Sequence, residues 1–180
     1  MVYLFLADGF EEIEALYTLD ILRRASINIK TVGVTGKTAT GSHKIPVICD
    51  IAIQELSAND DFDMIILPGG LPGAYNLDDS EAVSNFIEIA HKNNKFICAI
   101  CAAPFILGKR GILKGKKATC FPGFENELAG AEIQNCGCVR DGNIITARAM
   151  GSAHEFALEI LKALSSPEAS DKMKKAIILN

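Results

Sequence analysis

Cys101 is the residue of this sequence with the clearest potential for chemistry. It follows an apolar stretch of strand length, 96–100, and a helical pattern over 102–109 begins at the next residue. Only a tight turn can join a strand to a helix without a loop, and such a turn lifts its side chain above the sheet, as in the nucleophile elbow of hydrolases. The turn also puts the thiol at a helix N-terminus, where unpaired N–H groups favour a thiolate. A buried core cysteine is the alternative, and the spacing alone leaves both open.

A glycine-rich loop offers hydrogen-bond donors to such a cysteine. Pro68, Gly69 and Gly70 follow a short strand, and glycines at a strand end let backbone N–H groups approach a ligand closely. Together with the N–H of Ala102, this loop can form an oxyanion hole beside Cys101. A plain turn explains a double glycine equally well.

Three acids, Glu11, Glu12 and Glu14, follow the first strand. Acids in a first helical turn usually only stabilise the helix dipole, and we interpret Glu11 and Glu12 in this way. Glu14 differs because its neighbours at 10, 13 and 17 are apolar, so that its carboxyl is partly desolvated and its pKa raised. Such a carboxyl can give a proton to a neighbouring thiol or accept one from it.

The other cysteines and the histidines give weaker signals. Cys98 and Cys101 have thioredoxin spacing, but Cys98 falls inside the strand. A zinc site with Cys136 and Cys138 is disfavoured because no histidine stands at ligand spacing, so we expect neither a metal nor a cofactor. His154 begins a long predicted helix and is a weak candidate for a catalytic partner. His43 and His91 carry no functional signal.

The elements that position these residues alternate between strand and helix. Apolar runs at 2–7, 29–34, 64–67, 96–100 and 144–147 predict buried strands, with a further strand at 117–120. Helical patterns begin near residue 13 and run over 80–91, 102–109, 152–164 and 168–175, while 35–54 predicts a small β-hairpin excursion. This alternation predicts an α/β fold with a mostly parallel sheet covered on both faces, in one domain, 1–180. Ligands in such sheets bind at the carboxyl ends of the strands, which here are 7–9, 67–70 and 100–102.

Composition narrows the possible partners. The net charge is −4 and no concentrated basic face is present, which argues against nucleic acid. No apolar run approaches the ~20 residues that a membrane span needs, and the first residues do not resemble a secretory signal. We therefore expect a cytoplasmic protein whose six cysteines are reduced.

Four segments in combination resemble the ThiJ/PfpI superfamily, in the branch of the Parkinsonism-associated protein deglycase and the bacterial ThiJ-like proteins. The segments are 8–14, 67–70, 99–104 and 151–158, and the resemblance extends over almost the whole chain. It implies a flavodoxin-like three-layer sandwich and a homodimer. It also implies that Cys101 is the elbow cysteine, easily oxidised to a sulfinate, and that protonated Glu14 hydrogen-bonds to it.

The resemblance also assigns the surroundings of the cysteine. Gly70 and Ala102 match the backbone donors, Gly69 belongs to the same pocket, and Arg24 matches an arginine near the dimer interface and the pocket. Two departures matter. Ala102 stands where the PfpI-type proteases have a histidine, which disfavours peptidase activity. Phe121 stands where the human-like branch has a histidine, and Cys120 is a further cysteine beside the pocket.

Two functions follow from the resemblance. In the first, Cys101 and Glu14 act on a small aldehyde or dicarbonyl substrate in oxidative or carbonyl stress, as a glutathione-independent glyoxalase (glyoxalase III) or a deglycase. In the alternative, the protein is a chaperone-like redox sensor that is regulated by oxidation of Cys101 without turnover. The missing histidine favours the second somewhat, while the cysteine, the glutamate and the glycine loop fit both.

Overall fold

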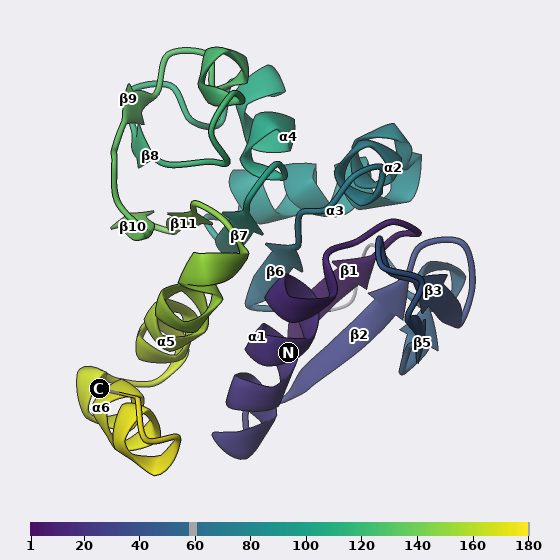
Figure 1. The fold of residues 1–180 in the computed structure, drawn as a ribbon. Coiled ribbons are helices and arrows are strands. Elements are labelled where there is room, and N and C mark those ends of the chain that lie inside the picture. Colours follow the sequence, from purple (N-terminus) through teal and green to yellow (C-terminus); the bar gives the residue numbers. More distant parts are fainter. Residues whose placement is uncertain (58–60, 180) are drawn as a thin grey trace.

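The computed structural model describes residues 1–57 and 61–179, and its centre is a seven-stranded sheet (Figure 1). Five neighbouring pairs of strands are parallel, and only the pair at one edge is antiparallel. The mostly parallel sheet that the sequence predicts is thus confirmed. From edge to edge the strands are β10 (Cys138–Asp141), β11 (Ile144–Ala147), β7 (Phe96–Ile100), β6 (Met64–Leu67), β1 (Val2–Leu6), β2 (Ile29–Gly33) and β5 (Ile51–Ala52).

The central strands are apolar without interruption because helices cover both of their faces. In β1, Val2, Leu4 and Leu6 belong to one hydrophobic cluster, and the alternate residues Tyr3 and Phe5 belong to the other. Successive side chains of a strand point to opposite faces, so a strand in the middle layer needs apolar residues at every position. The two clusters therefore form two cores, one on each side of the sheet.

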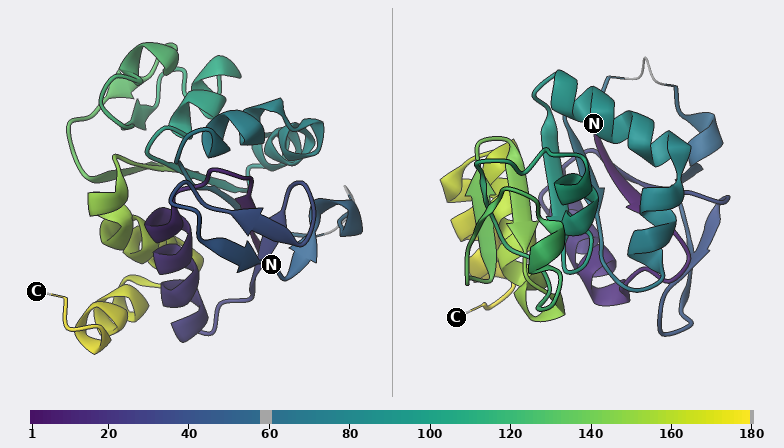
Figure 2. Two further views of the ribbon diagram at one scale, coloured as in Figure 1. Left: turned by 45° about the vertical axis from the view of Figure 1, so that its right-hand side comes forward. Right: turned by 90° about the horizontal axis from the view of Figure 1, so that it is seen from above.

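The six helices of the described residues make the outer layers of this three-layer sandwich (Figure 2). One core holds apolar residues of α1 (Glu12–Arg24) and α5 (Ala153–Leu164), with α6 (Pro167–Ala176) packed against α5. The other core holds apolar residues of α2 (Gly73–Asp79), α3 (Glu81–Lys92) and α4 (Pro104–Lys109). The hydroxyl of Ser80 caps α3 by accepting a hydrogen bond from the N–H of Val83 at 3.3 Å.

Two small sheets lie outside the main one. Strands β3 (Thr38–Thr40) and β4 (Pro46–Ile48) form an antiparallel hairpin, as the sequence predicts for this region. The strand expected at 117–120 is shorter: β8 (Lys117–Ala118) pairs only with β9 (Glu132–Ile133). Three short 3₁₀ turns complete the elements, η1 (Ile53–Glu55), η2 (Glu125–Glu127) and η3 (Met150–Ser152).

Three local features differ from the sequence-based expectation. Helix α2 begins directly after the proline- and glycine-rich loop, whose composition indicates only a turn. Strand β10 is short and carries Arg140 and Asp141, so its sequence lacks an apolar run. Helix α4 begins at Pro104 rather than at residue 102. Across the described ranges, no helix is long and apolar enough to cross a membrane.

Candidate active site

Cys101 occupies the sharp turn that the sequence predicts at the end of β7. Its φ is +64°, in the left-handed region that residues with a side chain rarely adopt. The N–H of Cys101 donates to the carbonyl of Ala147 at 2.9 Å, and its own carbonyl accepts from the N–H of Phe121 at 2.7 Å. The strained conformation is therefore held from both sides. Because α4 begins at Pro104, the helix N-terminus lies further from the thiol than the sequence suggests.

Glu14 is the acid that this fold buries beside the cysteine. Its side chain is in the first turn of α1 and the residue is only 1% exposed. One carboxyl oxygen, Oε2, accepts a hydrogen bond from the N–H of Gly69 at 2.8 Å. The other, Oε1, is buried without a hydrogen-bond partner among the described residues. A buried acceptor without a donor is unfavourable for a carboxylate, whereas a proton on this oxygen removes the charge.

Gly69 lies between the side chains of Cys101 and Glu14 and leaves room for both. A Cβ at this position would lie 2.5 Å from the Cβ of Cys101 and 2.7 Å from Oε2 of Glu14. The neighbouring Gly70 has a φ of +85°, and a Cβ there would lie 2.3 Å from the backbone nitrogen of Glu11. Both glycines are therefore needed so that the loop can pass between the start of α1 and the cysteine turn.

The two groups titrate as a pair. Burial raises the pKa of Glu14 to about 7, against the hydrogen bonds from Cys101 and Gly69. Burial, with the charge and the hydrogen bond of Glu14, raises the pKa of Cys101 to about 12, while the backbone N–H groups of Gly70 and Ala102 lower it. Because the groups interact, these two pKa values belong to the pair. Between about pH 7 and pH 12 the pair therefore carries one negative charge, because burial opposes a second negative charge.

The groups that set the pKa of the Cys101 thiol therefore differ from those that the sequence suggests. Sequence reasoning relied on the helix N-terminus, but the structure gives the main influence to burial and to Glu14. The backbone N–H groups of Gly70 and Ala102 lower the pKa of Cys101, and their role as donors to an oxyanion stays a prediction. A thiol with a carboxyl partner and two N–H donors can attack a carbonyl, pass its proton to the carboxyl and stabilise developing negative charge.

The other predicted pocket residues fall in different places. The backbone of Phe121 is bonded to Cys101, and its side chain is 43% exposed. Cys120 is 4% exposed and lines a separate cavity of about 120 Å³ with Arg148, and burial raises the pKa of its thiol to about 11.

Arg24 lies at the opposite end of α1 from Glu14, about 15 Å along the helix axis, and pairs with Asp20. Within one chain the length of the helix separates Arg24 from the thiol, and its expected place near a dimer interface stays a prediction.

The three histidines pair with other residues or are exposed, and none is bonded to Cys101 in the described part of the chain. His154 faces Glu155 at 3.8 Å at the start of α5, and His91 is exposed near the end of α3. His43, which carried no signal in the sequence, instead pairs with Glu12. No hydrogen bond or ion pair joins any of the three to Cys101 within residues 1–57 and 61–179.

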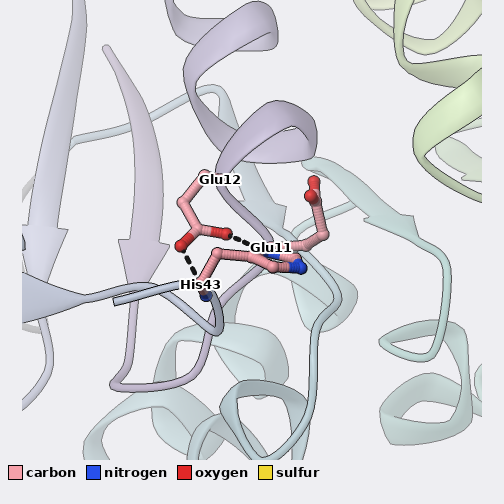
Figure 3. A group of neighbouring side chains, drawn as sticks. All are labelled: Glu11, Glu12 and His43. Carbon is pink, nitrogen blue, oxygen red and sulfur yellow. Dashed lines mark hydrogen bonds and ion pairs between the residues drawn. The ribbon is translucent and has the colours of Figure 1, made fainter. Parts of the chain in front are cut away.

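Glu12 fastens the β3–β4 hairpin to the start of α1 (Figure 3). It is 3% exposed, and its carboxylate accepts from the backbone N–H of His43 at 2.7 Å and lies 2.9 Å from Nδ1 of the same residue. The interpretation of Glu12 as a dipole-stabilising acid was therefore incomplete. That interpretation does fit Glu11, whose Oε2 caps the helix by accepting from the N–H of Glu14 at 2.7 Å. The ligand atoms of Glu11, Glu12 and His43 lie within 4.8 Å of one another, but both acids already serve as acceptors.

Replacing Glu12 with glutamine is expected to lower the free energy of unfolding by about 1–2 kcal/mol, because a buried charged acceptor is lost. Burial opposes ionisation of Glu12, but the hydrogen bonds from His43 outweigh it and lower the pKa, while Glu12 raises the pKa of His43. The Glu12 contribution is lost as pH falls below its ordinary value of 4.5, and the His43 contribution is lost as pH rises above 6.5.

Urea unfolding of the wild type and the Glu12→Gln variant between these two pH values and at alkaline pH measures this effect. The difference between the two proteins should be largest in the acidic window. The His43→Gln variant serves as control, since it keeps the backbone hydrogen bond and removes only the titrating ring. An identical difference at both pH values would contradict an ionic contribution from His43.

Comparisons with known proteins agree with this geometry. The model of the DJ-1/PfpI family matches residues 1–163. Protein dj-1beta of Drosophila melanogaster is 34% identical over 177 residues, which cover 97% of this chain and 94% of that protein. Among solved structures, a DJ-1 superfamily protein from Salmonella typhimurium gives a TM-score of 0.94 at 32% identity, covering 99% of this chain and 98% of the other.

Two more distant relatives have names that state an activity. A protein named a glutathione-independent glyoxalase, from Caenorhabditis elegans, is 29% identical and covers 94% of this chain and 90% of its own length. A protein named a deglycase, from Pyrococcus abyssi, is 30% identical and covers 88% of this chain and 95% of its own length. With a family model over most of its length and relatives above 30% identity across almost all of it, the chain belongs to the DJ-1/PfpI family.

Proposed function

We propose that this chain is a cysteine-dependent enzyme that acts on small reactive dicarbonyls, as a glutathione-independent glyoxalase or a deglycase. The observation that carries the proposal is the buried pair of Cys101 and Glu14, in which burial raises the pKa of the carboxyl to about 7. A group with that pKa can both take and give a proton at neutral pH. The names of the nematode and archaeal relatives support the same substrate class.

The proposed reaction with a 2-oxoaldehyde begins at the aldehyde carbon. The sulfur of Cys101 attacks it while the thiol proton passes to Glu14, and the N–H groups of Gly70 and Ala102 hold the oxyanion, which then takes the proton from Glu14 to give a hemithioacetal. The carboxylate of Glu14 removes the hydrogen of the former aldehyde carbon as a proton and returns it to the neighbouring carbon, while the hydroxyl proton moves from the first oxygen to the second, giving a thioester of a 2-hydroxy acid. Water hydrolyses this thioester and releases the acid and the free thiol, so that the net change is addition of one water.

The direct test is consumption of methylglyoxal by the purified protein in a buffer without glutathione or any other thiol. Proton NMR of the mixture should show lactate appearing as methylglyoxal disappears. A protein that consumes methylglyoxal only stoichiometrically, without lactate, would contradict turnover and indicate a simple adduct.

A second candidate function, redox sensing through Cys101 without turnover, is favoured by Phe121. This side chain stands where a related histidine would supply an imidazole, so among residues 1–57 and 61–179 Glu14 is the titratable partner left for the thiol. Oxidation by a peroxide in two steps, each transferring one oxygen to the sulfur and releasing water, would give a sulfinate next to the carboxyl of Glu14. Intact mass after mild peroxide treatment tests this, with two added oxygens on Cys101 as the expected result.

We also propose that the chain forms a homodimer and acts in the cytoplasm. Three exposed apolar residues lie on α1 and on the hairpin that Glu12 fastens to it: Ile13 and Ile45 are each 50% exposed, and Ile48 is 83% exposed. Exposed apolar side chains on segments that are bonded to each other favour association. All six cysteines are free, which supports a reducing compartment. Light scattering during size-exclusion chromatography measures the mass of the assembly, and an Ile48→Lys variant should weaken it.

A histidine at position 121 is expected to raise the kcat/KM for methylglyoxal by at least about tenfold, because a positioned imidazole adds a general base. The N–H of Phe121 donates to the carbonyl of Cys101 at 2.7 Å, so the new ring would start from a backbone already fixed beside the nucleophile. Initial rates of Phe121→His and of a Phe121→Asn control measure the effect. Equal rates in both variants would show that the gain is due to polarity rather than to proton transfer.

A further inference from the structure

A second cavity lies at the end of the molecule away from Cys101. Its volume is about 570 Å³, and its walls come from the last turn of α1, the end of α5 and the length of α6. This volume is within the range of small-molecule sites, about 300–1,000 Å³. Glu14 stands at the first turn of α1 and this cavity at the last, so the length of that helix separates it from the proposed active site.

The floor of this cavity is apolar. Leu161 of α5 and Met173 of α6 line it, and both belong to the core on this side of the sheet. Ile177, which follows α6, and the alanines at 25, 169 and 176 complete the apolar lining. Leu161 and Met173 are already buried, so an alkyl chain that entered the cavity would cover mainly the part-exposed side chain of Ile177 and the alanines, which is favourable in proportion to the apolar area buried.

The rim of the same cavity is basic. Arg24 of α1 and Lys172 of α6 both line it, and no acidic side chain does among the described residues. Arg24 binds Asp20 through Nε, and its two terminal nitrogens have no hydrogen bond to a described residue. Lys172 forms no ion pair with any residue of the described ranges. Lys172 is therefore the available cation of this rim, whereas Arg24 already shares its charge with Asp20 and offers only its terminal nitrogens.

The hydroxyls of Ser26 and Ser165 add hydrogen-bond donors at this rim. A guanidinium, an ammonium and hydroxyl groups around an apolar floor complement a ligand with an anionic head and an apolar body. A carboxylate matches the fork of Arg24 geometrically, since guanidinium groups bind carboxylates through two parallel N–H donors.

We propose that this groove between α1, α5 and α6 is a binding site for a free aliphatic carboxylate of medium chain length. The carboxylate lies between Arg24 and Lys172, and the chain lies along Leu161, Met173 and Ile177. The site goes beyond the dicarbonyl chemistry and needs neither Cys101 nor Glu14, so either proposal can fail without the other.

Binding is tested with decanoate below its micelle concentration, by calorimetry and by amide shifts in ¹H–¹⁵N spectra. Two probes of equal chain length separate the contributions: decanol lacks the charge, and decyltrimethylammonium reverses it. We expect saturable binding of decanoate, weaker binding of decanol and no binding of the cation, with amide shifts around 161–177. Equal affinity for all three probes would overturn the proposal, since it would indicate nonspecific apolar contact.

Variants locate the site. Lys172→Glu should weaken decanoate binding by about fivefold or more, whereas Lys174→Glu, the same change on α6 outside the cavity lining, should leave it unchanged. Ala169→Trp should abolish binding by filling the groove, and Cys101→Ala should have no effect. Unfolding curves establish that each variant is folded. Binding that survives both Lys172→Glu and Ala169→Trp in folded protein would place the ligand elsewhere and refute the proposed site.

Discussion

Replacing Cys101 with serine is expected to reduce the turnover of methylglyoxal at least about a thousandfold, because a hydroxyl in the same place ionises far less readily than a thiol. Serine is the sharpest substitution here since it keeps the shape of the side chain at a position with φ of +64°. Initial rates of lactate formation measure the change, and circular dichroism establishes that the fold is retained.

Cys120→Ser is the matched control for this experiment. Cys120 lies next to Phe121 in the chain, but its thiol is buried and lines the separate cavity with Arg148. Turnover should therefore remain near the wild-type rate in this variant. If Cys101→Ser stays active while Cys120→Ser does not, the nucleophile has been assigned to the wrong thiol; if both stay active, the reaction needs neither of these two thiols.

Most of the fold could be predicted because its signals are local. The central strands are continuous apolar runs, and a buried strand with helices on both faces requires this pattern. Helix α2 and strand β10 lack such a pattern. Gly73 opens α2 directly after a loop of glycines and prolines, and β10 is an antiparallel edge strand with charged residues, so tertiary pairing rather than composition fixes them.

The residues of the candidate site also divide into those that local sequence predicts and those that tertiary contacts determine. Cys101, Gly70 and Ala102 are recognisable because a strand end and a glycine loop are visible in the sequence, and Glu14 because its neighbours are apolar. The contact between Glu12 and His43 joins residues 31 positions apart through a hairpin whose placement the sequence does not determine. The place of Arg24 near a dimer interface stays a prediction, because one chain does not show which residues a second copy would bring beside it.

Glu14→Gln is expected to separate reactivity of the thiol from turnover. The amide has nearly the shape of the carboxyl but cannot carry a proton between carbons, so the rate of lactate formation should fall by about a hundredfold or more. Alkylation of Cys101 by iodoacetamide needs no such transfer and should stay within about tenfold of the wild type at alkaline pH. In the wild type, alkylation should accelerate mainly as pH rises toward about 12, because the proton lost near pH 7 comes from Glu14 and its carboxylate raises the pKa of Cys101.

The unfolding free energy provides a second and independent readout of the same pair. Burial raises the pKa of Glu14 from 4.5 to about 7, so the native state holds a proton that the unfolded chain has already released. Stability should therefore be complete below pH 4.5 and fall by about 3 kcal/mol as pH rises to about 7. Glu14→Gln should remove this slope, whereas Glu11→Gln, a loss of charge three residues earlier, should preserve it. A slope that survives in Glu14→Gln would mean that another buried acid holds the proton, and the pair could not then act as the proton carrier of the reaction.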